Sequence, residues 1–400
     1  MQSATLDRHA PARRDPTLLR AAVTCAGDAV REGLLPGIVV GVGDAGGPLV
    51  VETFRGRRTR RLRDDSVFFL ASLTKPVVAA AVMRLVDAGR VDLDAPIGRY
   101  VPAFGGDGKD RVTVRHVLTH TAGVYDVPTE ILRTKRPSAA RMLEIVCREP
   151  LTFVPGTRYE YCSSSFYLLA DILARAEERP FPEALHRLVL EPAGMADTTF
   201  DPRHDRSRIV PVEGVPLRNI VVRELVLRYL ARATNPGGGL WGTCIDLLRF
   251  GAALTPTAIR DGHGLLSQAA VDEMTREQTS GILEVSADGA TRDPRYALGW
   301  GKPRLDGGIP SVVGGSAPPL GDDVSTGHPP IDGLAAAPGD AVPASPRSFT
   351  HGGATGTRLW VDPERDLVFV FLTNQWGAGD GPMFEVLKGV YEAWDGRPSG

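Results

Sequence analysis

The strand patterns of this 400-residue chain lie at its two ends, and this arrangement limits the possible folds more than any other feature. Residues 37–54 contain two β-rich runs joined by a Gly/Asp turn, a pattern that predicts a hairpin. Two further strand patterns occur within residues 357–373, and an amphipathic helix is expected from Met383 to Trp394. Residues 90–300 show mostly helical patterns with loops. The order of these patterns predicts that the termini build one sheet around an inserted helical region.

Composition narrows the class of protein. The formal net charge of −2 and the sequence pI near 6.5 argue against nucleic acid or an anionic membrane as the main partner. The four cysteines are far apart and show no C-x-x-C spacing, which predicts neither a zinc site nor a disulfide framework. Residues 1–15 lack the apolar core of a secretory signal, and Arg84 interrupts the best candidate for a membrane span. We therefore expect a cytoplasmic protein without a metal or cofactor.

The domain organisation follows from the same patterns. We expect residues 1–14 to form a disordered arm and residues 15–400 to form a single domain. Residues 302–348 are dominated by Gly, Pro, Ala and Asp and contain no Phe, Tyr or Trp, so we expect a disordered insertion or a mobile lid there. The other parts of the domain are a sheet at about 15–70 and 349–400 and a helical part at about 90–300.

The segment Ala71-Ser72-Leu73-Thr74-Lys75-Pro76 opens a long apolar stretch that ends at Gly89. Proline lacks an amide donor and is tolerated only near the first turn of a helix, so Pro76 predicts a helix start close to Ser72. Residues three apart share one face of a helix, so the Ser72 hydroxyl and the Lys75 amine can meet. Both lie at the positive end of the helix, where unpaired amides can hold an oxyanion. An ordinary amphipathic helix with a capping serine is the alternative interpretation.

A tyrosine-rich loop from Pro155 to Ser163 precedes a further apolar helical pattern. If Tyr161 lies beside the Lys75 ammonium, the positive charge favours a phenolate. The phenolate could take the Ser72 proton and later give it to a leaving group. The alternative is a half-buried tyrosine whose hydroxyl makes an ordinary hydrogen bond.

A third cluster, Phe349 to Thr357, consists mostly of small residues and precedes a predicted strand. Its glycines let a substrate approach the backbone closely, and an exposed strand edge offers amide donors to that substrate. A tight β-turn without further function is the alternative interpretation. Taken by itself, this cluster does not decide between the two.

The three clusters together resemble the serine β-lactamase and penicillin-recognising superfamily, closest in pattern to class C β-lactamases, family VIII esterases and D-specific peptidases. The resemblance covers roughly residues 20–395, apart from residues 302–348. It implies an α/β (α+β) fold of the β-lactamase/transpeptidase type, with an antiparallel sheet flanked by helices. Further segments occur where the family has its landmarks: Val114 to Gly123, Pro192 to Met195, Gly237 to Trp241, Asp246, and Leu298 to Trp300.

The resemblance also implies roles for single residues. Ser72 would be the acylated nucleophile, Lys75 its base partner and Tyr161 the second acid/base group. The backbone amides of Ser72 and Ala354 would form the oxyanion hole. Whether Lys75 or Tyr161 is the base stays open, because so close a pair titrates as one unit. The implied substrate-binding residues are Ser163, His351, Gly352 and Gly353.

Three of these positions depart from the family pattern. His351 replaces a lysine whose permanent charge meets a substrate carboxylate, and histidine is mostly neutral at pH 7. Gly352 replaces a hydroxyl residue, and Ser163 replaces an asparagine that could hold a substrate amide. All three changes weaken recognition of a carboxylate-bearing amide, and esterase-like members of the family show the same loosening.

Three other motifs are rejected. Gly41-x-Gly43-x-x-Gly46 formally matches a dinucleotide fingerprint, but a strand rather than a helix is expected after it. His116 and His120 have the spacing of two metal ligands on a helix, yet no third ligand is evident, so we interpret both as structural hydrogen-bonding residues. The chain has no G-x-S-x-G, which excludes the nucleophile elbow of α/β-hydrolases.

We therefore expect a serine hydrolase that forms an acyl-Ser72 intermediate and passes the acyl group to water. The expected partner is a small-molecule ester, which makes a carboxylesterase the first choice. An acyltransferase that serves an alcohol or amine in natural-product tailoring is the main alternative, and a D-amino-acid peptidase or β-lactamase is another. A catalytically silent scaffold is less favoured because Ser72, Lys75 and Tyr161 are all present.

Overall fold

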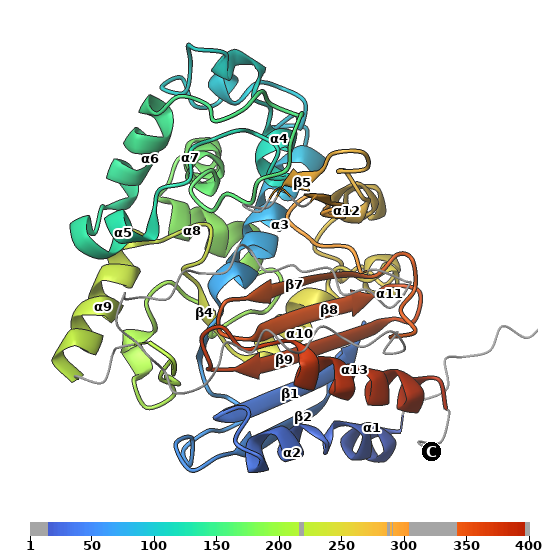
Figure 1. Cartoon of the computed structure of the whole chain (residues 1–400). Helices are drawn as coiled ribbons and strands as arrows, with labels where there is room; N and C mark the ends of the chain where they lie inside the picture. The colour runs from blue at the N-terminus through green and yellow to red at the C-terminus, as the bar shows by residue number, and fades with distance from the viewer. Residues whose placement is uncertain (1–14, 216–219, 286–288, 290, 304–341, 397–400) are drawn as a thin grey trace, which may run out of the picture.

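The computed structural model describes residues 15–215, 220–285, 289, 291–303 and 342–396 (Figure 1). The predicted arm at 1–14 and most of the predicted lid or disordered insertion at 302–348 lie outside the described residues. None of the helices among the described residues combines the length and the apolar character needed to cross a membrane. The helices are α1 (Pro16–Val23), α2 (Ala26–Arg31), α3 (Thr74–Asp87), α4 (Val114–Leu118), α5 (Thr129–Lys135), α6 (Ala139–Arg148), α7 (Phe166–Glu177), α8 (Phe181–Leu185), α9 (Ile220–Ala233), α10 (Cys244–Ala252), α11 (Pro256–Arg260), α12 (Gln268–Thr275) and α13 (Gly381–Trp394). The strands are β1 (Gly37–Asp44), β2 (Gly47–Arg55), β3 (Phe68–Phe69), β4 (Trp241–Gly242), β5 (Glu284–Val285), β6 (Thr291–Arg292), β7 (Phe349–Gly353), β8 (Thr357–Asp362) and β9 (Leu367–Thr373).

Five strands form one antiparallel sheet in the order β2-β1-β9-β8-β7. The N-terminal hairpin joins the C-terminal strands through β1 and β9, where Ile38 lies opposite Thr373 and Gly43 lies opposite Val368. Figure 1 shows the blue strands β1 and β2 beside the red strands β7 to β9, with most of the helices above them. The predicted fold, in which the two ends of the chain build one sheet, is therefore confirmed. Strand β7 is left at the edge of the sheet that faces the helical part.

Helices cover both faces of the sheet. Because successive residues of a strand point to opposite sides, a strand can contribute side chains to two clusters. On β9, Phe369 and Phe371 pack in one cluster with side chains of α1 and α13. The alternate residues Val368 and Val370 pack in the main core, which includes α10 on the opposite face. Figure 1 shows α1 and α13 together on their side of the sheet. The sheet is therefore a layer between two apolar clusters.

Helix α3 runs through the centre of the main core. Every residue from Thr74 to Met83 is buried, as expected of a helix that is apolar on all sides. The helix packs against α7 and α12, whereas the short 3-10 helix Ala71–Leu73 before it packs against β7 and β8. The start of α3, where Ser72 lies, is therefore the place where the helical part meets the edge of the sheet.

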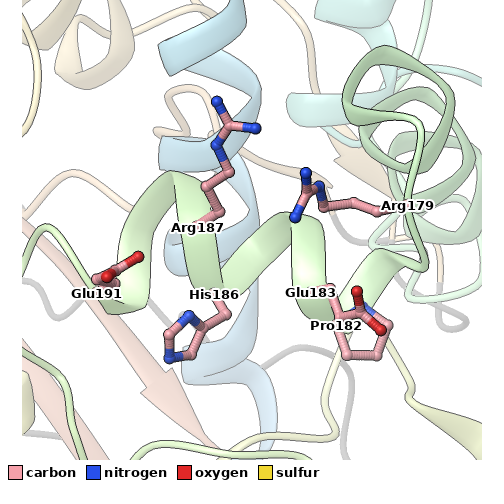
Figure 2. A pocket seen from close by; sticks show the side chains of 6 residues that line it. All are labelled: Arg179, Pro182, Glu183, His186, Arg187 and Glu191. Carbon is pink, nitrogen blue, oxygen red and sulfur yellow. The ribbon is translucent and has the colours of Figure 1, made fainter.

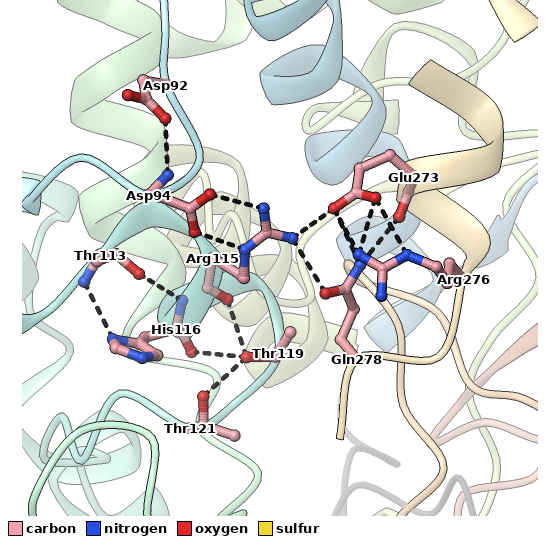
Figure 3. Close-up of polar contacts among 10 residues, drawn as sticks. All are labelled: Asp92, Asp94, Thr113, Arg115, His116, Thr119, Thr121, Glu273, Arg276 and Gln278. Atoms are coloured by element: carbon pink, nitrogen blue, oxygen red, sulfur yellow. Dashed lines mark hydrogen bonds and ion pairs between the residues drawn. The ribbon is translucent and has the colours of Figure 1, made fainter. Parts of the chain in front are cut away.

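An ion-pair network ties the loop before α4, α4 itself and α12 together (Figure 3). The Arg115 guanidinium donates to the two carboxylate oxygens of Asp94, at 2.7 and 2.9 Å. On its other side it donates to the Glu273 carboxylate at 2.5 Å and to the Gln278 side chain at 3.0 Å. Arg276 donates to the same Glu273 carboxylate but is more exposed, at 57% against 25% for Arg115. Arg115 is therefore the centre of the network, and Arg276 lies at its edge.

Replacement of Arg115 by alanine is expected to lower the free energy of unfolding by about 1–3 kcal/mol, because Asp94 and Glu273 lose a shared, partly buried partner. Arg276→Ala is the matched control and should cost less than about 1 kcal/mol, since exposed ion pairs contribute little. Urea unfolding followed by circular dichroism measures both. Equal losses in the two variants would contradict the central position of Arg115.

Candidate active site

Ser72 lies in a strained turn at the start of α3. The 3-10 helix Ala71–Leu73 continues directly into this helix. Ala71 has a φ of +48°, a backbone conformation that costs an L-residue about 1–3 kcal/mol. The Thr74 hydroxyl stabilises the turn, since it donates to the Ala71 carbonyl at 2.7 Å and accepts from the Leu240 amide at 3.0 Å. These bonds fix Ser72, which is half-buried, at the junction of helix and sheet.

The Lys75 side chain is buried completely and lies against Ser72. Its Nζ is 3.3 Å from the Ser72 Oγ, and it donates to the Ser163 Oγ at 3.0 Å and to the Gly237 carbonyl at 2.6 Å. Burial lowers the pKa of Lys75 to about 7, and the Asp126 carboxylate opposes this effect. A large fraction of Lys75 is therefore neutral near pH 7.

The three oxygens around the Lys75 Nζ suit both of its protonation states. An ammonium group has three N–H donors, one for each oxygen. A neutral amine keeps two N–H donors for Ser163 and Gly237, and its lone pair can then accept from the Ser72 hydroxyl. In that state Lys75 can take the Ser72 proton and make the serine oxygen nucleophilic.

Tyr161 borders the same space. The Lys75 Nζ lies 4.5 Å from the centre of the Tyr161 ring, and the Tyr161 hydroxyl is buried without a hydrogen bond of normal geometry among the described residues. Burial raises the pKa of Tyr161, and the adjacent Ser72 hydroxyl only partly opposes this rise. The condition for the expected phenolate is therefore not met, because burial disfavours the anion and a neutral Lys75 supplies no compensating charge. Tyr161 keeps its proton and can donate it.

His120 holds the Tyr161 loop in place. Its carbonyl accepts from the Glu160 amide at 2.9 Å and its Nδ1 accepts from the Cys162 amide at 3.1 Å, so both neighbours of Tyr161 are bound to one residue. The imidazole also packs on the Tyr161 ring, with 4.3 Å between the ring centres. Burial lowers the pKa of His120 well below its usual value, so the ring stays a neutral acceptor. His120 reaches this position with a φ of +58° at the end of α4, where glycine is usual.

The turn between β7 and β8 lies against the residues that precede the serine. The Thr355 hydroxyl donates to the Phe69 carbonyl at 2.8 Å. Gly353 comes so close that a Cβ at this position would lie 2.4 Å from the Leu70 oxygen, which excludes any larger residue. These contacts hold the Ala354 turn next to the start of α3. The Ala354 amide and the first-turn amide of the serine, which lacks an acceptor within its helix, can together hold an oxyanion.

His351, predicted to bind substrate, is occupied by contacts within the protein. It is buried completely, its Nδ1 donates to the Gly352 carbonyl at 2.8 Å, and its Nε2 accepts from the Tyr296 hydroxyl at 3.0 Å. Burial lowers the pKa of His351 to about 3, so the imidazole is neutral, as the sequence predicted. A Cβ at Gly352 would lie 2.9 Å from the Arg358 Cζ, so this glycine makes room for a buried arginine. The geometry thus favours support of the edge strand over direct substrate contact.

One protein family accounts for most of the chain. The sequence model of the beta-lactamase family matches residues 19–385. The chain belongs to the beta-lactamase family. It is 30% identical over 365 residues to esterase EstB from Burkholderia gladioli, which covers 82% of this chain and 83% of that protein.

Solved structures agree with this family assignment at the level of the fold. A family VIII carboxylesterase is similar with a TM-score of 0.70 and 19% identity, covering 96% of this chain and 99% of that one. EstCE1, described as a hydrolase with promiscuous acyltransferase activity, has a TM-score of 0.68 and 19% identity, covering 94% and 99%. The chain is thus a hydrolase of the serine beta-lactamase family with the fold predicted above.

Gly237 and Tyr296 were not predicted to belong to the site. Gly237 contacts Lys75, and Tyr296 contacts His351. Gly237 was only a family landmark in the sequence, yet its carbonyl binds Lys75. A Cβ at Gly237 would lie 2.6 Å from the backbone carbonyl oxygen of Ser163. The run of three glycines that begins at Gly237 was therefore the signal in the sequence for a close approach of two segments. No local sequence pattern predicted the contact between Tyr296 and His351, because the two residues are 55 positions apart.

An open pocket of about 450 Å³ lies on the helical part of the beta-lactamase fold, and Figure 2 shows its lining side chains. Acidic and basic side chains share its rim, and none of them belongs to the group around Ser72. We assign this pocket no catalytic role. Its lining residues are Arg179, Pro182, Glu183, His186, Arg187 and Glu191.

The variant His120→Phe keeps an aromatic ring against Tyr161 but removes the acceptor of the Cys162 amide. We expect its kcat/KM for a p-nitrophenyl ester to fall at least about tenfold, because small displacements of a reacting group are costly. The control is His116→Phe, which removes the acceptor of the Thr113 amide at the other end of α4. This control should retain activity within about threefold. A similar loss in both variants would indicate a general effect on α4 instead.

Proposed function

We propose that this chain is a carboxylesterase that works through an acyl-Ser72 intermediate. The observation that carries the proposal is the Lys75 Nζ, 3.3 Å from the Ser72 Oγ in a buried site that lowers the lysine pKa to about 7. A neutral amine at this distance is a suitable base for a serine nucleophile. The relationship to esterase EstB supports the choice of an ester as substrate.

The acylation step uses three groups of this chain. Lys75 takes the Ser72 proton while the serine oxygen forms a bond to the ester carbonyl carbon. The resulting oxyanion accepts hydrogen bonds from the amides of Ser72 and Ala354. When the carbon–oxygen bond to the leaving alcohol breaks, Tyr161 donates its proton to the departing oxygen and regains a proton from the Lys75 ammonium. Water then repeats the sequence on the acyl-enzyme and releases the carboxylic acid.

The charges at the third cluster favour an ester over a carboxylate-bearing amide. His351 is neutral and bound to Tyr296, so it offers no cation to a substrate carboxylate. Ser163 is bound to Lys75, and its hydroxyl is shorter than the amide side chain that the family pattern has there. An ester that carries neither a carboxylate nor an amide group loses nothing from these two changes.

Intact-protein mass spectrometry tests the nucleophile. We expect p-nitrophenyl acetate and a fluorophosphonate each to add one group to the parent protein, and Ser72→Ala to remain unmodified. Tyr161→Phe should still form the adduct, more slowly by about 10²-fold, because a proton donor contributes about that much. No adduct from either reagent would favour the catalytically silent scaffold over any hydrolase.

The pH profile tests the base. kcat/KM is expected to rise about tenfold per pH unit at low pH and to level off above an apparent pKa of about 7, because only the neutral Lys75 amine can take the proton. Tyr161→Phe should lower the whole curve and leave this pKa in place. If the inflection disappears in Tyr161→Phe, then the tyrosine and not Lys75 is the titrating base.

Acyl transfer to an alcohol or amine is the second candidate function. The likeness to EstCE1, a hydrolase with promiscuous acyltransferase activity, is the observation that favours it. Competition between water and an added short amine or alcohol separates the two functions. An esterase should release more than about nine-tenths of the acyl group as acid at millimolar acceptor, whereas a dedicated acyltransferase should form mainly the new ester or amide.

A further inference from the structure

A carboxylate is fixed beside the site by the same segment that carries Tyr161 and Ser163. Asp126 lies in the loop after α4, and its Oδ1 accepts from the Ser164 amide at 2.9 Å and from the Ser164 hydroxyl at 2.6 Å. The Ser164 hydroxyl in turn accepts from the Val127 amide at 2.9 Å. Ser164 follows directly after Ser163, which binds the Lys75 amine. Asp126 is therefore held one residue away from the first ring of contacts around the base.

Asp126 is exposed, and no arginine or lysine forms an ion pair with it among the described residues. Its charge nevertheless reaches the site, since it is the charged group that acts most strongly on Lys75 and it also acts on Tyr161. Arg358, which lies against Gly352, is already paired with Asp380 at 2.5 Å. When Lys75 is neutral, Asp126 is therefore a carboxylate next to the Tyr161 segment that has no ion pair among the described residues.

We propose that Asp126 forms a subsite for a cationic group, such as an ammonium, on the ester substrate. This inference rests on the proposed esterase function and reverses the charge preference implied by the family pattern, in which a lysine meets a carboxylate. The position occupied by that lysine is neutral in this chain, because His351 is buried and bound to Tyr296. Once Lys75 has lost its proton, a substrate cation near Ser164 would meet a carboxylate that no lysine or arginine among the described residues pairs with.

Three thioesters with one acyl group test the subsite. Acetylthiocholine carries a cation, 3,3-dimethylbutyl thioacetate is its neutral isostere, and 3-(acetylthio)propanoate carries an anion, and all three release a thiol that a disulfide dye detects. At pH 8.5, where Lys75 is neutral, we expect kcat/KM of the parent to be about three- to tenfold higher for the cation than for the isostere, and lower still for the anion. This preference should shrink as ionic strength rises from about 0.05 to 0.5 M, because salt screens an exposed charge.

Asp126→Asn is the decisive variant. Asparagine keeps a side-chain oxygen for the Ser164 donors and removes the charge, so the loop contacts persist. We expect its cation preference to fall to within about twofold of unity, while kcat/KM for the neutral isostere stays within about threefold of the parent. Ser164→Ala, which removes one bond to Asp126 and keeps its charge, should retain part of the preference.

Two results would overturn the subsite. Equal kcat/KM for the three thioesters in the parent would mean that the Asp126 carboxylate does not discriminate between substrates by charge. A preference that persists in Asp126→Asn means that another group creates it and that Asp126 serves the loop alone. Hydrolysis of none of the three, together with no adduct on Ser72, overturns the proposed esterase function and the subsite with it.

Discussion

The burial of the Lys75 amine is the interaction on which the rest of the site depends. An ammonium group without solvent is costly unless oxygens replace its water, and desolvation pushes the group toward its neutral form. The oxygens around the amine come from Ser72, Ser163 and Gly237, which lie on three separate segments of the chain. The fold must bring all three together before the lysine can act on the serine. Its basicity is therefore a property of the tertiary structure and not of the tetrad alone.

Near the Lys75 amine, residues with strained backbone conformations are held in place by hydrogen bonds. Ala71 and His120 both have positive φ. The Thr74 hydroxyl of the same turn binds the Ala71 carbonyl, and the Cys162 amide of a neighbouring segment binds the His120 imidazole. Such conformations persist only where surrounding contacts outweigh their cost. In this protein one of them orients the serine and the other orients the loop of Tyr161. The sheet contributes the third support, because its edge strand leads into the turn that carries Ala354.

The sequence predicts those parts of the site that depend on local geometry. Ser72 and Lys75 share a helix face because they are three residues apart, and the strand patterns at both ends predict a joined sheet. The Gly237 carbonyl lies 162 residues from Lys75, so no local pattern connects them. The pKa of Tyr161 could not be predicted from the sequence, because burial raises it and burial is known only after folding. Asp126 is an ordinary loop aspartate in the sequence, and only its bonds to Ser164 place it at the site.

The most direct test of this account is a titration of the lysine side chains by NMR. The chain has only five lysines, so isotope-labelled lysine gives few signals, and Lys75→Arg and Lys302→Arg assign the two whose pKa values burial lowers, to about 7 and about 8. The account predicts that one signal titrates near pH 7 and is missing in Lys75→Arg. A Lys75 signal that titrates near its usual value of about 10.4 would contradict the account, because the amine would then be charged at every pH where Ser72 must react.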